Sequence, residues 1–110
     1  MVPKNRNNVP TPVDFTLISK ALVIISGKWR LTIILLIGED TFRFRQFREQ
    51  LPSMSEKMLA GELKALVALD VLTRTVYAEV PPRVEYSLTK KGRLALPILR
   101  QLQQVGHLFN

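Results

Sequence analysis

The fold is decided by residues 80–89, which read VPPRVEYSLT. From Val84 to Leu88 every second residue is apolar and the residues between them are polar. This period of two is typical of a β-strand that packs one face on a core. Pro81 and Pro82 have no backbone N–H to donate to a neighbouring strand, so they favour a turn. The stretch therefore predicts a turn that leads into the second strand of a β-hairpin.

The residues before this turn supply the first strand. Residues 71–77 are rich in β-branched side chains, and residues 78–82 are few enough to form the tip of a hairpin. Arg83 follows the rigid pair of prolines directly. We therefore expect a two-stranded hairpin that presents Arg83 near its tip.

Residues 44–69 predict a helix-turn-helix in front of the hairpin. Apolar residues repeat at i, i+3 and i+7 from Phe44 to Leu51, which indicates a short helix that Pro52 stops. A second helix, called the reading helix below, is expected from about residue 56 to residue 69. Two helices followed by a hairpin predict a winged helix-turn-helix, whose second helix can enter the major groove of DNA.

Two serines compete for the start of the reading helix. Ser55 suits the N-cap, because its hydroxyl can accept a hydrogen bond from an unpaired backbone N–H of the first turn. Ser53 with Glu56 reads instead as a capping box. These alternatives leave the start of the helix open by two residues.

Helices are also expected on both sides of this motif. The apolar spacing predicts one helix over residues 14–25 and another, apolar on nearly every face, over residues 28–37. Residues 41–43 suffice only for a stub strand, and Thr89 is expected to cap a last helix to about residue 108. The fold class is therefore mainly α (α+β). The first and last helices carry more apolar surface than one small core needs, which agrees with dimerisation through them.

The bulk composition fits one basic domain. The 110 residues are 46% hydrophobic, and lysine and arginine outnumber the acids 16 to 9, which gives a net charge of +7. Such a surface attracts polyanions, either nucleic acid or acidic lipid headgroups. Residues 1–12, with three prolines and three asparagines, predict a flexible arm, and residues 13–110 form the domain.

Nothing in the sequence indicates a membrane or an export signal. Residues 29–37 form the longest apolar run, far short of the roughly 20 residues that a membrane span needs. No apolar segment with a small-residue cleavage site follows Met1. We therefore expect a cytoplasmic protein with no membrane partner.

Few residues could support catalysis or hold a metal. The chain has no cysteine, so it can form no disulfide, no thiolate metal site and no thiol redox switch. His107 is the only histidine and lies near the chain end, away from any metal cluster or Ser-His-Asp arrangement. Gly27-Lys28 lacks the spaced glycine of a phosphate loop. We expect no enzyme and no cofactor, and the sequence identifies no small-molecule effector.

Several segments resemble one known family. They are Gly27-Lys28-Trp29, Arg43-Phe44, residues 52–59 (PSMSEKML), residues 80–89, and Leu94 and Pro97 after Gly92. Together they resemble the HxlR-type family of bacterial and archaeal regulators. The resemblance implies a homodimer of winged helices, joined through N- and C-terminal helices, that binds a partly palindromic operator and represses or activates nearby genes. The alternative is a winged helix that docks an acidic protein partner without sequence-specific DNA binding.

The chain departs from the family pattern at two places. Many members carry a cysteine just before the equivalent of Pro12, where this chain has Thr11, so thiol sensing is not carried over. On the reading helix, Ala60 and Gly61 stand where relatives often have longer polar residues. Gly61 weakens the helix by about 1 kcal/mol relative to alanine. Either the backbone at Gly61 approaches the DNA closely, or little is read there.

Three candidate DNA-binding residues on or beside the reading helix carry polar side chains. Lys57 and Lys64 lie on its outward face, where we expect contacts to phosphates or guanine edges. An ordinary solvated face is the alternative for both lysines. For Ser55 we place capping ahead of phosphate contact.

The remaining candidates are arginines. Arg43, Arg45 and Arg48 lie on or beside the preceding helix, where contact with flanking backbone and plain solubility are equally open; Arg43 alternatively supports the fold. At the wing tip Arg83 is the charge most favoured for DNA, because a rigid Pro-Pro turn presents it and the minor groove attracts guanidinium groups. Its alternative is an ion pair with Glu79 or Glu85.

Overall fold

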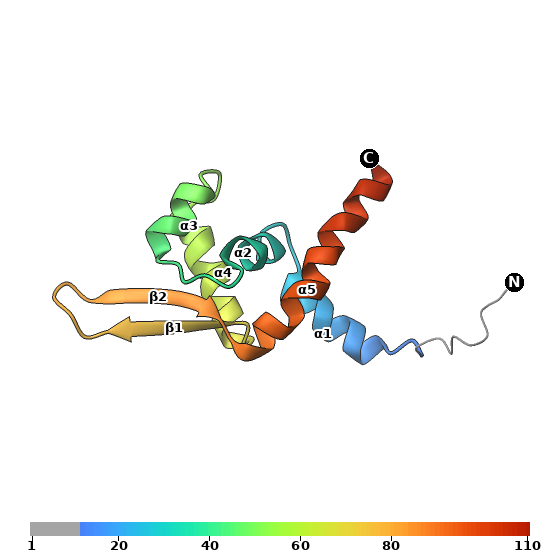
Figure 1. The fold of residues 1–110 in the computed structure, drawn as a ribbon, viewed down its shortest axis with the longest axis horizontal. Helices are drawn as coiled ribbons and strands as arrows, with labels where there is room; N and C mark the ends of the chain where they lie inside the picture. Colours follow the sequence, from blue (N-terminus) through green and yellow to red (C-terminus); the bar gives the residue numbers. More distant parts are fainter. Residues whose placement is uncertain (1–11) are drawn as a thin grey trace, which may run out of the picture.

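The computed structural model describes residues 12–110, which form helices and one β-hairpin. Within that range the elements run α1 (Phe15–Ile25), α2 (Arg30–Ile37), α3 (Phe44–Gln50), α4 (Glu56–Ala68), β1 (Leu72–Tyr77), β2 (Arg83–Leu88), α5 (Lys90–Val105) and a 3₁₀ turn (Gly106–Phe109) (Figure 1). This order confirms the predicted winged helix-turn-helix. The predicted arm at residues 1–12 lies outside the described residues except for Pro12.

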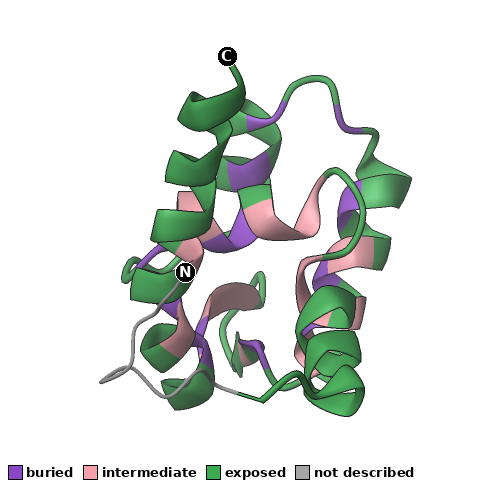
Figure 2. Ribbon diagram, turned by 90° about the vertical axis from the view of Figure 1, so that its right-hand side faces the viewer, coloured by how far each residue is buried: buried purple, intermediate pink, exposed green. Residues whose placement is uncertain are grey.

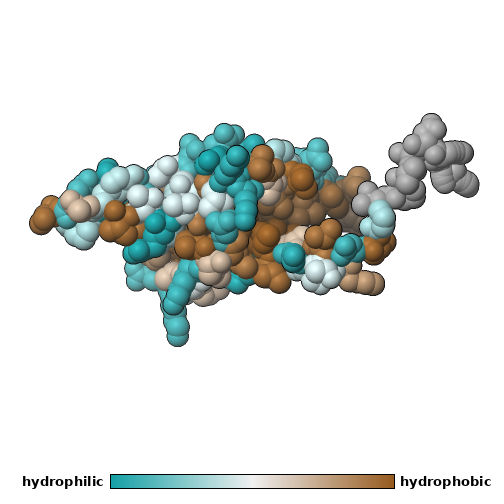
Figure 3. All heavy atoms as spheres, turned by 90° about the horizontal axis from the view of Figure 1, so that it is seen from below, coloured by the Kyte–Doolittle hydropathy of each residue, from teal (hydrophilic) through white to brown (hydrophobic). Residues whose placement is uncertain are grey.

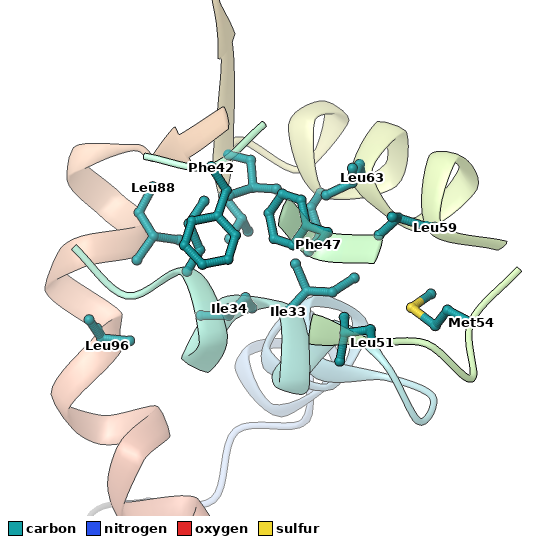
Figure 4. Close-up of a cluster of buried hydrophobic side chains, with 14 residues drawn as sticks. Ile33, Ile34, Phe42, Phe47, Leu51, Met54, Leu59, Leu63, Leu88 and Leu96 are labelled. Atoms are coloured by element: carbon teal, nitrogen blue, oxygen red, sulfur yellow. The ribbon is translucent and has the colours of Figure 1, made fainter. Parts of the chain in front are cut away.

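The core forms around α2. Ile33, Ile34 and Ile37 are fully buried, as expected of a helix that is apolar on nearly every face. Figure 4 shows Ile33 and Ile34 below the rings of Phe42 and Phe47, whose centroids lie 5.0 Å apart. Buried residues also come from α3, α4 and both strands, whereas most of α5 is exposed (Figure 2). The helix begins at Arg30, two residues later than predicted.

The turn between α3 and α4 is fixed by Ser55. Its hydroxyl oxygen accepts a hydrogen bond from the backbone N–H of Met58 at 3.0 Å, which makes Ser55 the N-cap of α4. The structure thus chooses Ser55 over the alternative start at Ser53. Met54, next to the cap, is buried and ties the turn to the core.

At its other end α4 stops in a tight reversal. Asp70 adopts a positive φ of 63°, and the N–H of Val71 donates to the carbonyl of Leu66 at 2.9 Å. This is the hydrogen bonding of a Schellman motif, with buried Leu66 and Val71 as its apolar contact. The motif sends the chain directly from α4 into β1.

The hairpin is antiparallel, from Leu72 opposite Leu88 to Tyr77 opposite Arg83. Phe42 bridges to Tyr86 on the outer edge of β2, which confirms the stub strand. The tip, residues 78–82, lies at the opposite end of the molecule from α1 (Figure 1). The hairpin therefore projects beyond the core as a wing.

Helix α5 leaves the wing through a close contact. Thr89 caps it, with its hydroxyl accepting from the N–H of Gly92 at 3.0 Å. A Cβ on Gly92 would lie 2.7 Å from the carbonyl oxygen of Val71, so only glycine fits there. The α-helix ends at Val105, earlier than predicted, because glycine at position 106 disfavours helix and the chain tightens into a 3₁₀ turn.

No helix within residues 12–110 combines the length and the apolar character that crossing a membrane requires.

Candidate nucleic-acid interface

The outward face of α4 is exposed and carries the predicted reading residues. Leu59, Leu63 and Leu66 turn into the core. Lys57 and Lys64 lie on the opposite face, and neither forms an ion pair with any residue in the range 12–110. The two ammonium groups are therefore uncompensated on this side of the helix.

Between the two lysines, the outward face of α4 is formed by small residues. Ala60 and Gly61 are exposed, and a Cβ built on Gly61 would meet no atom within 4 Å. No contact inside the described part of the chain thus requires glycine at position 61. A glycine that weakens a helix without a packing reason is consistent with an outside surface that comes close to the backbone.

The arginines of α3 have acidic neighbours. Arg48 Nη1 lies 2.8 Å from Glu56 Oε1, and Arg45 Nε lies 4.0 Å from Glu49 Oε2. All four side chains are exposed, Arg48 the least at 46%, so the arginines can exchange these carboxylates for other anions at little cost. The structure thus places the guanidinium group of Arg48 beside the start of α4 and that of Arg45 beside Glu49 of α3, and neither is left uncompensated.

Arg43 stands at the start of α3. Its backbone N–H donates to the side-chain oxygen of Gln46 at 2.8 Å, and its side chain is exposed. The backbone of Arg43 therefore supports the fold, while its guanidinium group remains available to a ligand.

Arg83 is held within the wing. Its Nη2 lies 3.1 Å from Glu79 Oε2, its Nε lies 3.7 Å from Glu85 Oε2, and its guanidinium carbon lies 4.1 Å from the centre of the Tyr77 ring. Both alternative ion-pair partners that the sequence offered are thus engaged. Contact between Arg83 and DNA stays a prediction, and it would require the guanidinium group to exchange these carboxylates for phosphate.

The sequence interpretation missed Arg74 on β1. This arginine is exposed and forms no ion pair with residues 12–110. It lies two residues after buried Leu72, so both side chains are on the same face of the strand. A charged residue on the core side of a strand is the signal that could have revealed it.

Helices α1 and α5 expose a broad apolar surface on the side away from the wing. No residue of α1 is buried, and Figure 3 shows hydrophobic side chains gathered over these helices. The largest contributors are Phe15 and Leu17 of α1, Leu94 and Ile98 of α5, and Leu108 and Phe109 of the 3₁₀ turn that follows, each more than half exposed. Apolar surface of this extent marks a contact site on a small domain.

The sequence model of the HxlR-like helix-turn-helix family matches residues 24–110, which include α2 to α5 and the wing. The chain belongs to the HxlR-like helix-turn-helix family. It is 40% identical over 104 residues to an HTH-type transcriptional regulator of Halalkalibacterium halodurans, covering 94% of this chain and 88% of that protein. It is 39% identical over 100 residues to the regulator YybR of Bacillus subtilis, covering 91% and 76%.

Solved structures agree with this membership. The oxidized form of the redox regulator HypR superposes with a TM-score of 0.77 at 37% identity, covering 83% of this chain and 94% of HypR. These relatives are transcriptional regulators and not enzymes. The HxlR-like chain is accordingly a transcriptional regulator of the helix-turn-helix type.

Proposed function

We propose that this HxlR-like regulator binds duplex DNA sequence-specifically as a homodimer, with α4 in the major groove. The exposed face of α4 carries the proposal, because its two uncompensated lysines flank the small residues Ala60 and Gly61. A major groove about 12 Å wide admits an α-helix, and small side chains let the backbone of that helix approach the base edges. In this arrangement Lys57 and Lys64 contact phosphates or guanines, and Gly61 permits the close approach.

The flanking residues act on the DNA backbone. Arg45 and Arg48 lie on α3, with Arg48 beside the start of α4, and Arg43 is the N-cap of α3. Their exposed guanidinium groups contact phosphates next to the groove, as arginines in most DNA interfaces do. Ser55 acts chiefly as the cap that fixes the first turn of α4. Arg83 first stiffens the wing and contacts DNA only after it leaves its carboxylate partners.

Dimerisation uses the apolar surface of α1 and α5. The exposed side chains there would otherwise face water, and the surface lies on the side of the molecule away from the wing. A two-fold pair joined through it presents two α4 helices to one duplex. For such dimers the two half-sites lie about one helical turn, or a multiple of it, apart.

The test mixes the purified chain with duplex fragments of its host genome and sequences the fragments that it binds. We expect the bound fragments to share two inverted half-sites at a fixed spacing. Fragments with no common motif would contradict sequence-specific binding. Retention of an acidic protein after nuclease treatment, with no selective DNA shift, would support the protein-docking alternative instead.

In the 110 residues any sensing mechanism works without a thiol, because the sequence has no cysteine. A thiol-based redox switch is therefore excluded for these residues.

A further inference from the structure

A hollow lies between α4 and the wing, next to the outward face of α4. It is lined by Phe44, Ala60, Lys64, Val67, Arg74 and Tyr86. These residues come from α3, α4 and both strands of the wing. The hollow is therefore formed only when the helix-turn-helix and the hairpin pack together.

The register of the hairpin turns Arg74 towards α4. Arg74 is paired directly with Tyr86, and directly opposed residues project on the same side of a sheet. The Tyr86 ring meets Phe47 of the core edge-on at a centroid distance of 6.1 Å, so this side of the wing faces the helices. Arg74 therefore extends from the core side of the strand, beyond the edge of the core, into the hollow.

The hollow holds positive charge with no carboxylate. Its lining has two basic side chains, Lys64 and Arg74, and no acid. Neither forms an ion pair within residues 12–110, whereas Arg45, Arg48 and Arg83 all do. The hollow thus joins two uncompensated cations, one from α4 and one from β1.

The remaining walls favour a bound anion. Phe44, Val67 and Tyr86 are half-buried and apolar over most of their surface, so they limit the water that can surround a ligand. A charge interaction is stronger beside such walls than in open solvent. Ala60 keeps the rim low on the side that α4 presents to DNA, which leaves the hollow accessible to a strand that follows the groove.

We propose that this hollow binds one phosphate of the DNA backbone between Lys64 and Arg74, a contact that extends the function proposed above and depends on it. The ammonium group supplies a point charge, and the guanidinium group can donate two parallel hydrogen bonds to phosphate oxygens. Because α4 and β1 each hold one cation, the bound phosphate fixes the wing relative to the helix in the groove. The backbone is thereby anchored at the junction of helix and wing rather than at the wing tip.

The first experiment measures the salt dependence of affinity for the duplex obtained by genomic selection. Each phosphate contact contributes about 0.9 to the slope of log affinity against log salt. We expect Arg74→Gln to lower the slope by about that amount for each half-site, and affinity about fivefold for each contact at about 0.15 M salt. Arg74→Lys retains the charge and should retain the slope. Arg100→Gln is the control, since it removes the same charge from α5, on the side away from the wing.

The second experiment locates the phosphate. Single phosphates of the duplex are replaced by uncharged methylphosphonates, and affinity is measured for the wild type, Arg74→Gln and Lys64→Gln. We expect one position per half-site where the replacement weakens the wild type and Arg100→Gln about fivefold, and weakens Arg74→Gln and Lys64→Gln clearly less, because each of these two variants keeps only one of the two cations. If the replacement weakens all variants equally at every position, the hollow holds no phosphate. Failure of the wild type to prefer any duplex would overturn the proposed function together with the hollow.

Discussion

Arg30 joins α1 to α4 through Glu62. Its Nε lies 2.9 Å from Glu62 Oε1, and its Nη1 donates to the carbonyl oxygen of Val23 at 2.8 Å. The two side chains are only 20% and 27% exposed, so water competes weakly for the contact. One guanidinium group at the start of α2 thus connects α1 with α4, the helix that carries Lys57 and Lys64.

Loss of this connection should lower stability. We expect Arg30→Met to reduce the free energy of unfolding by about 1.5 to 3 kcal/mol, the range for hydrogen bonds to charged groups. Urea denaturation measures this loss. The control is Glu49→Gln, which breaks the exposed pair with Arg45 and should change stability by less than about 0.5 kcal/mol. Equal effects of the two changes would show that Arg30 is not a structural link.

Gly61→Ala should separate folding from DNA binding. The new methyl group meets no atom of the described chain, and alanine favours helix over glycine by about 1 kcal/mol, so the thermal midpoint should rise. Affinity for the selected duplex should nevertheless fall about tenfold, the effect of a methyl group forced into a close contact. Gly106→Ala, equally open but beyond the end of α5, is the control. A Gly61→Ala variant with unchanged affinity would mean that the backbone does not approach DNA at this position.

Glu56→Gln should strengthen DNA binding. Glu56 is the first residue of α4, and its carboxylate pairs with Arg48. Without the negative charge Arg48 is free for phosphate, and we expect affinity to rise about two- to fivefold with a steeper salt dependence. The helix loses a favourable acidic residue from its first turn, which costs a few tenths of a kcal/mol. A weaker complex would place this end of α4 away from the DNA backbone.

Ile98→Glu should break the dimer. The side chain is 71% exposed in the single chain, so the charge does not disturb the core of the monomer. Light scattering should report a monomer at micromolar concentration, and affinity for a two-half-site duplex should fall at least about a hundredfold as bivalent binding is lost. Gln104→Glu adds the same charge on another face of α5 and should leave the dimer intact. A wild-type chain that is itself monomeric would contradict the two-fold arrangement.

The elements of the fold follow from local patterns. The alternation after Pro82 predicts β2, and Ser55 has the side chain that an N-cap requires. The outward position of Lys57 and Lys64 follows from helical periodicity alone. These predictions succeed because each depends on residues a few positions apart in the chain.

The partners of the charged groups could not be predicted in this way. Arg30 and Glu62 are 32 residues apart, and only the packing of α2 on α4 brings them together. The position of Arg74, opposite Tyr86 and towards α4, depends on the register of the hairpin. For Arg83 the sequence offered either of two glutamates, whereas the geometry of the hairpin lets it reach both. Ion pairs depend on distances between elements of the fold, and the periodicity of the sequence gives no information on those distances.

The most direct test of the account compares two affinities at one salt concentration. The purified chain is titrated into a labelled duplex from the region upstream of its own gene and into a random duplex of equal length. We predict that it prefers the upstream duplex by a factor of about 10³ or more, as sequence-specific regulators do. Equal affinity for both duplexes would contradict the proposal that α4 reads DNA sequence.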